Sequence, residues 1–121
     1  MAILDGVKGL EVWVEVDGER AEEYWDPADI PASATEVRRY IEGVPGKTFS
    51  ICHNFQKEFS PKRYGQRIII DIDGVIEERS VLTSATLKRG FCGECDGIEQ
   101  ATQNDKVVYR RFQFLDLNIG E

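Results

Sequence analysis

Apolar and polar side chains alternate along residues 10–16, 47–55 and 106–114, which is the period of a half-buried β-strand. Turns that contain Gly, Pro and Asp separate these stretches, and no segment has a long helical period. The pattern therefore predicts an all-β fold over residues 1–121, arranged as one antiparallel β-sandwich of jelly-roll type with about seven to eight short strands.

The apolar stretch at residues 67–81 has two interpretations. Asp71 and Asp73 resemble the first motif of haloacid-dehalogenase-type phosphatases, in which two aspartates serve as nucleophile and acid beside Mg²⁺. Alternatively, Asp73-Gly74 is the turn of a β-hairpin. The hairpin is favoured because the phosphatase motif must open into a helix, and because the same strand–Asp-Gly–strand pattern occurs at residues 14–19.

Two further segments are harder to interpret. Residues 33–36 form a helix capping box, whereas Val37, Arg39 and Ile41 alternate as in a strand. The strand-rich surroundings favour a strand that begins near Glu36. Residues 83–106 are polar and contain several glycines, and we expect them to form the longest irregular stretch.

Composition and charge narrow the possible functions. The chain has 121 residues and a net charge of −7, with 41% apolar and 31% charged residues, as expected for one globular domain. Residues 1–36 hold ten acids and two bases (net −8), whereas residues 37–121 hold twelve acids and thirteen bases (net +1). An acidic sector argues against nucleic-acid binding and leaves room for a basic protein partner or for head-to-tail self-association.

Signals for secretion or membrane insertion are missing from the sequence. The start of the chain lacks the charged and apolar regions of a signal peptide, and no apolar stretch approaches the ~20 residues that span a bilayer. Three cysteines, an odd number, give no disulfide framework. We therefore expect an intracellular protein, cytoplasmic or nuclear, without a membrane partner.

Cys92 and Cys95 are the weak candidates for a metal site. One Cys-x-x-Cys pair supplies half of the four ligands that zinc needs. Cys52 and His53 are adjacent in a predicted strand and point to opposite faces, so only one of them could join the pair, together with a carboxylate such as Glu94. The favoured interpretation is a loop with two reduced thiols, and neither a metal nor another cofactor is predicted.

The candidates for an interaction surface lie in and after the first predicted hairpin. Exposed aromatic side chains beside charge are a common interface composition. If residues 10–16 formed an edge strand, their outward carboxylates would oppose pairing between copies, and association would rise with salt. The candidate residues are Trp13, Trp25, Glu11, Glu15, Glu22 and Glu23.

Several strand and turn motifs resemble those of an uncharacterised family of small fungal domains, catalogued as a domain of unknown function. They are Leu4-Asp5-Gly6, Gly9-Leu10-Glu11-Val12, Val16-Asp17-Gly18-Glu19, Arg39-Tyr40-Ile41-Glu42, Gly46-Lys47-Thr48-Phe49-Ser50-Ile51, Asp73-Gly74, Ser80-Val81-Leu82 and Arg111-Phe112-Gln113-Phe114. The resemblance covers nearly the whole chain and implies a fungal intracellular β-sandwich with no activity to transfer.

These observations together predict a non-catalytic interaction or structural domain that self-associates or binds a protein partner. The alternatives are zinc binding through Cys92 and Cys95, or a Mg²⁺-dependent phosphatase-like enzyme that uses Asp71 and Asp73.

Overall fold

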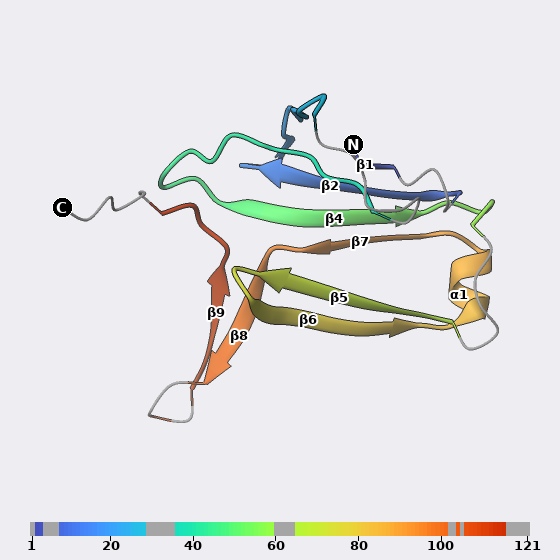
Figure 1. Ribbon diagram of the computed structural model, residues 1–121. Helices are drawn as coiled ribbons and strands as arrows, with labels where there is room; N and C mark the ends of the chain where they lie inside the picture. The colour runs from blue at the N-terminus through green and yellow to red at the C-terminus, as the bar shows by residue number, and fades with distance from the viewer. Residues whose placement is uncertain are drawn as a thin grey trace.

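A computed structural model describes residues 2–3, 8–28, 36–59, 65–101, 104 and 106–115 of the chain (Figure 1). Every strand pairing within these residues is antiparallel, which confirms the all-β prediction. In chain order the elements are β1 (Ala2–Ile3), β2 (Leu10–Val16), β3 (Glu19–Arg20), β4 (Phe49–Phe55), β5 (Gln66–Ile72), β6 (Val75–Leu82), α1 (Ser84–Lys88), β7 (Phe91–Cys95), β8 (Gly97–Ala101) and β9 (Val107–Arg111).

The largest sheet has five strands in the order β1-β2-β4-β7, with β3 also paired to β2. Strand β2 pairs with β4 along its whole length, from Leu10 opposite Phe55 to Val16 opposite Phe49. Its other side pairs with β1 and β3. Residues 10–16 are therefore not an edge strand, because neighbouring strands pair with both sides of β2. The condition for the association that rises with salt is not met.

The register of this sheet separates two faces. Because side chains alternate along a strand, Leu10, Phe55 and Phe91 share one face, which we call the inner face. Trp13, Cys52 and Glu94 share the other, the outer face, and they lie opposite one another on β2, β4 and β7.

Both Asp-Gly pairs form tight hairpin turns, as predicted. The φ angles are 50° at Asp17, 82° at Gly18, 53° at Asp73 and 83° at Gly74. Two consecutive positive φ angles define the type I′ turn, whose twist matches that of the flanking strands. The Asp71 carboxylate accepts a hydrogen bond of 2.9 Å from the backbone N–H of Gly74. This part of the chain is thus an antiparallel hairpin rather than a strand that leads into a helix.

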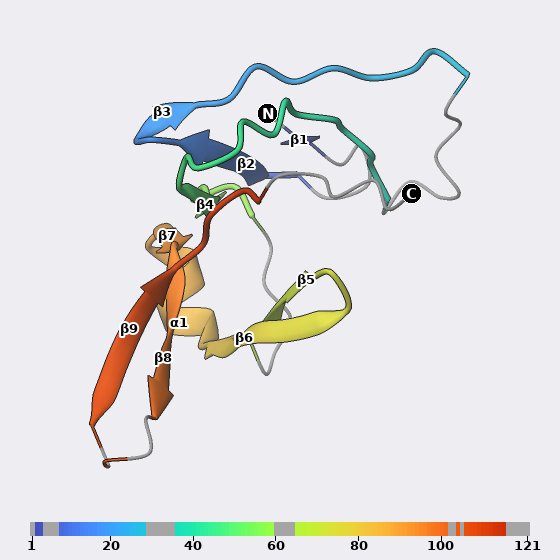
Figure 2. The same cartoon turned by 90° about the vertical axis from the view of Figure 1, so that its left-hand side faces the viewer.

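The core lies at the α1 end of the inner face, where the β5–β6 hairpin lies alongside the large sheet (Figures 1 and 2). Leu87 of α1 is fully buried there. The Phe55 and Phe59 rings meet edge to face with centroids 4.8 Å apart. The partly buried side chains that pack on this cluster are Leu10, Ile68, Leu82 and Phe91. The jelly-roll arrangement of two complete sheets stays a prediction, because β5–β6 and β8–β9 are separate two-stranded sheets.

Residues 83–106 are more regular than predicted, since they hold α1, β7 and β8. The helix begins because the hydroxyl of Thr83 caps it, accepting from the backbone N–H of Thr86 at 3.2 Å. No helix of the described residues is both long and apolar enough to cross a bilayer.

The strand expected from Glu36 is also wrong. Residues 36–39 have no regular structure, and Tyr40 makes one isolated antiparallel bridge with Tyr24. The first three residues of the capping box, 33–35, lie outside the described residues.

Candidate functional site

The β8–β9 hairpin projects away from the other strands in both views of the molecule (Figures 1 and 2). Within the described residues, the ladder of β8 is formed with β9 alone. All five residues of β9 are exposed, including Val107 at 66% and Tyr109 at 52%. The hairpin therefore presents apolar side chains that the rest of the described chain leaves in solvent.

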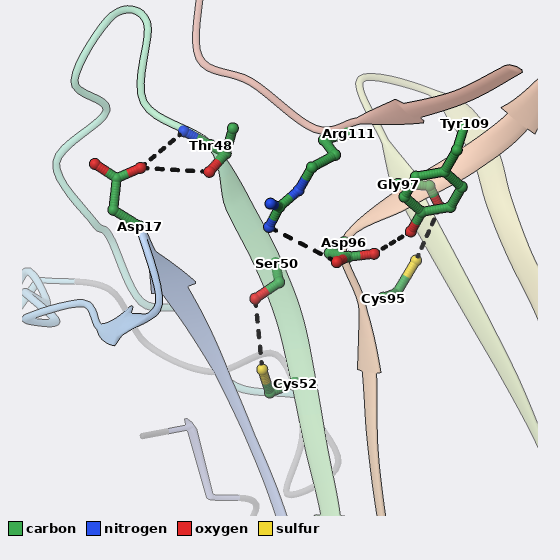
Figure 3. A network of polar contacts seen from close by, with 9 residues as sticks. All are labelled: Asp17, Thr48, Ser50, Cys52, Cys95, Asp96, Gly97, Tyr109 and Arg111. Carbon is green, nitrogen blue, oxygen red and sulfur yellow. Dashed lines mark hydrogen bonds and ion pairs between the residues drawn. The ribbon is translucent and has the colours of Figure 1, made fainter.

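Charged contacts hold the base of this hairpin (Figure 3). The phenol of Tyr109 donates a hydrogen bond to Asp96, and this bond raises the pKa of Tyr109 to about 12. The guanidinium of Arg111 lies 3.7 Å from the same carboxylate. Lys106, just before β9, and Arg110 are exposed as well. Together with Arg111 they place three bases beside the apolar side chains of β9.

A second exposed surface, which we call the acidic aromatic patch, lies where residues 19–24 run beside residues 40–44. Backbone hydrogen bonds of 2.8 Å and 2.7 Å join Tyr24 to Tyr40. A hydrogen bond to Glu22 raises the pKa of Tyr24, which places that carboxylate beside the ring. A hollow of about 330 Å³ opens here, with Val16 and Val44 among its apolar residues. Two bases also line it: Arg20, which lies over the Trp13 ring, and Lys47, which lies 4.0 Å from the Asp17 carboxylate. The patch consists of Glu19, Glu22, Tyr24, Tyr40 and Glu42.

The two predicted tryptophans do not form a shared exposed surface. Trp13 is only 8% exposed on the outer face, with the guanidinium carbon of Arg20 4.2 Å from its ring centroid. Trp25 is 64% exposed, and the guanidinium of Arg39 lies 5.4 Å from its ring. Sequence alternation alone placed Trp13 in solvent, because it could not show that Arg20 would cover the indole.

The four glutamates predicted as interaction residues also differ in their surroundings. Glu22 is exposed in the acidic aromatic patch, and Glu23 beside it is half-buried. Glu11 accepts a hydrogen bond of 3.1 Å from the Gln56 side chain. Glu15 accepts one of 3.3 Å from the indole nitrogen of Trp13. Glu11 and Glu15 therefore contribute to packing on the outer face, whereas Glu22 is exposed and lies beside the Tyr24 phenol.

Cys92 and Cys95 lie on opposite faces of β7, because their spacing of three residues is odd in a regular strand. Cys92 is exposed and Cys95 is buried. They therefore cannot hold one ion together while β7 keeps this conformation. The sequence interpretation of residues 90–93 as a loop concealed this separation.

A different thiol lies among carboxylates on the outer face. The sulfur of Cys52 and the carboxylate oxygens of Glu15 and Glu94 all lie within 4.8 Å of one another. The Ser50 hydroxyl lies 3.8 Å from the Cys52 sulfur (Figure 3). Burial raises the pKa of the Cys52 thiol to about 11, and the nearby acidic groups add to this effect against the opposing hydrogen bond from Ser50. These three residues are the described group that could hold a metal.

Comparison with known proteins identifies the family and no activity. No curated protein sequence and no solved structure matches the chain at a significant level. Residues 9–121, nearly the whole chain, match the family model described as a domain of unknown function, DUF7918. The chain therefore belongs to the DUF7918 family.

Proposed function

We propose that this chain is a non-catalytic protein-interaction domain that associates with further copies of itself, head to tail. In this arrangement the β8–β9 hairpin of one copy docks on the acidic aromatic patch of the next. The observation that carries the proposal is the exposure of the apolar side chains on the projecting hairpin, above all Val107.

Hydrophobic burial supplies the driving force. Removing a side chain such as Val107 from water stabilises a complex by about 1.5–3 kcal/mol. A two-stranded hairpin is at best marginally stable by itself in water. Docking against another copy would therefore both bury β9 and hold the hairpin in one conformation.

Charge decides which surface of the second copy the hairpin meets. Lys106 and Arg110 on the hairpin are exposed bases, and Glu19 and Glu22 on the patch are exposed acids. The aromatic rings of Tyr24 and Tyr40 add faces on which an arginine can stack. Pairing of β9 with β9 would instead bring like charges together, so the two contacting surfaces differ.

An association through two different surfaces is heterologous, and it forms open chains or rings rather than stopping at a symmetric dimer. The non-catalytic part of the proposal rests on the structural role of Asp71. Its carboxylate accepts a hydrogen bond from the backbone N–H of Gly74 in the hairpin turn. The fungal and intracellular setting stays a prediction.

Light scattering of the purified chain across protein concentration tests the proposal. We expect the mean mass to rise with concentration at low salt and to fall as salt increases, because the screening length is about 8 Å at physiological ionic strength. Val107→Ser should reduce the association at least tenfold. The matched control is Val81→Ser, since Val81 of β6 is equally exposed and lies outside both surfaces. A monomer at every concentration, or equal effects of the two variants, would contradict the proposal.

A further inference from the structure

Three strands bring two carboxylates and one thiol together on the outer face of the large sheet. Cys52 of β4 lies directly opposite Glu94 of β7. Glu15 of β2 lies opposite Ser50, two residues from Cys52, so its side chain reaches the thiol diagonally. The three ligand atoms come within 4.8 Å of one another, although the residues are far apart in the sequence.

Neighbouring side chains hold two of these three groups in place. The Trp13 indole nitrogen donates to Glu15 at 3.3 Å, and the Ser50 hydroxyl contacts the Cys52 sulfur at 3.8 Å. Trp13, Ser50 and Cys52 are each less than 9% exposed. Hydrogen bonds from buried neighbours are what orient the ligands of protein metal sites.

From this arrangement we infer that Glu15, Cys52 and Glu94 form a zinc-binding site. Zinc accepts cysteine sulfur at about 2.3 Å and carboxylate oxygen at about 2.0–2.2 Å, which places neighbouring ligand atoms about 3.5 Å apart in a tetrahedron. The three ligand atoms lie within 4.8 Å of one another, so zinc binding requires them to approach by up to about 1.3 Å. Magnesium and calcium fit less well, because both prefer ligand sets made only of oxygen.

Zinc binding changes the charge of the site and releases one proton. One Zn²⁺ meets two carboxylates and the Cys52 thiol, and the thiol proton leaves to solvent as the Zn–S bond forms. Glu94 is exposed, so the ion can enter from solvent on its side and a water molecule completes the fourth position. The site is independent of the proposed self-association, because neither Val107 nor the acidic aromatic patch takes part in it.

Cobalt substitution in the full chain tests the site, since Co²⁺ replaces zinc and a cobalt–thiolate bond gives a near-ultraviolet charge-transfer band. We expect one equivalent of Co²⁺ to produce this band and one equivalent of Zn²⁺ to remove it. Cys52→Ser should abolish the band, whereas Cys95→Ser, on the opposite face, should keep it. Circular dichroism verifies that both variants are folded.

Glu94→Gln provides a test that does not alter a buried residue, because Glu94 is exposed. Its zinc affinity, measured by competition with a chelator of known affinity, should fall at least tenfold. The matched control is Glu99→Gln, an exposed carboxylate on β8 whose loss should change the affinity less than twofold. The inference is overturned if the unaltered chain gives no band, if Cys52→Ser retains it, or if the two glutamate variants bind zinc equally.

Discussion

The imidazole of His53 fills the space that a β-carbon on Gly93 would need. Its Nε2 and Cε1 atoms lie 2.5 Å and 2.6 Å from the position of that carbon, and the ring of Phe91 lies 2.9 Å away. His53 and Gly93 are direct partners between β4 and β7. A glycine at position 93 thus allows a large, buried side chain to lie on the inner face of the neighbouring strand.

Gly93→Ala should destabilise the domain by about 1–3 kcal/mol, because the added methyl group overpacks a closed site. Urea denaturation followed by fluorescence measures the change. In a His53→Ala background the same substitution should cost less, since the ring is gone, although Phe91 still limits the space. Equal costs in the two backgrounds would show that the clash with His53 is not the cause.

Gly74→Ala should cost about 1–2 kcal/mol through its backbone alone. No atom lies within 4 Å of the position of the new methyl group, so the cost arises from forcing a non-glycine residue to a φ of 83°. Asp73→Asn is the control, because asparagine suits the first position of a type I′ turn equally well. A comparable loss of stability in Asp73→Asn would mean that this carboxylate has a role beyond the turn.

The fold was predictable from the sequence wherever local chemistry determined it. Asp17-Gly18 and Asp73-Gly74 specify their turns directly, and the alternation from Leu10 to Val16 specifies β2. Strand β7 was not predicted because Gly93 interrupts the apolar alternation of its inner-face residues, Phe91 and Cys95. The sequence does not show that the His53 ring fills the space beside this glycine.

The candidate sites depend on how neighbouring strands align, and this register cannot be read from a local sequence pattern. Cys52, Glu15 and Glu94 meet only because three strands align as they do, and the Cys92–Cys95 spacing suggested a different pair. Strand β8 lay in a stretch that looked irregular, whereas β9 falls within the strand predicted over residues 106–114. The β8–β9 hairpin is exposed because the chain leaves the large sheet where β7 ends at Cys95, and β8 then pairs with β9 in a separate two-stranded sheet.

Cys92 should react with an alkylating reagent well before the other two thiols. It is exposed, whereas Cys52 and Cys95 are 4% and 6% exposed. With a pKa of about 11, Cys52 has only about one molecule in a thousand as the reactive thiolate at pH 8. Peptide mass spectrometry after brief labelling with a chelator present measures the order. Labelling of Cys52 as fast as Cys92 would contradict the packing of the outer face.

Tyr109 should remain protonated at a higher pH than an ordinary tyrosine. Its phenol donates to Asp96, and the raised pKa of about 12 means that the proton is held until the pH passes that value. Asp96→Asn removes the negative charge and should return the transition toward the ordinary value near 10. Ultraviolet difference titration of the two proteins reports the shift. An unchanged titration would show that the Tyr109–Asp96 contact is absent in solution.

Head-to-tail association is tested most directly by exchanging the charges of its two surfaces. The hairpin variant is Lys106→Glu with Arg110→Glu, and the patch variant is Glu19→Lys with Glu22→Lys. Each variant alone places like charges on both surfaces and should remain monomeric. Mixed in equal amounts they carry opposite charges, so association should return.

Light scattering of the two variants, separately and mixed, is the measurement. Lys57→Glu with Lys88→Glu, near the other end of the molecule, changes the net charge as much as the hairpin variant and should associate as the unaltered chain does. The account predicts monomers in each separate solution and larger species in the mixture. A mixture that stays monomeric while the unaltered chain associates would contradict the pairing of the β8–β9 hairpin with the acidic aromatic patch.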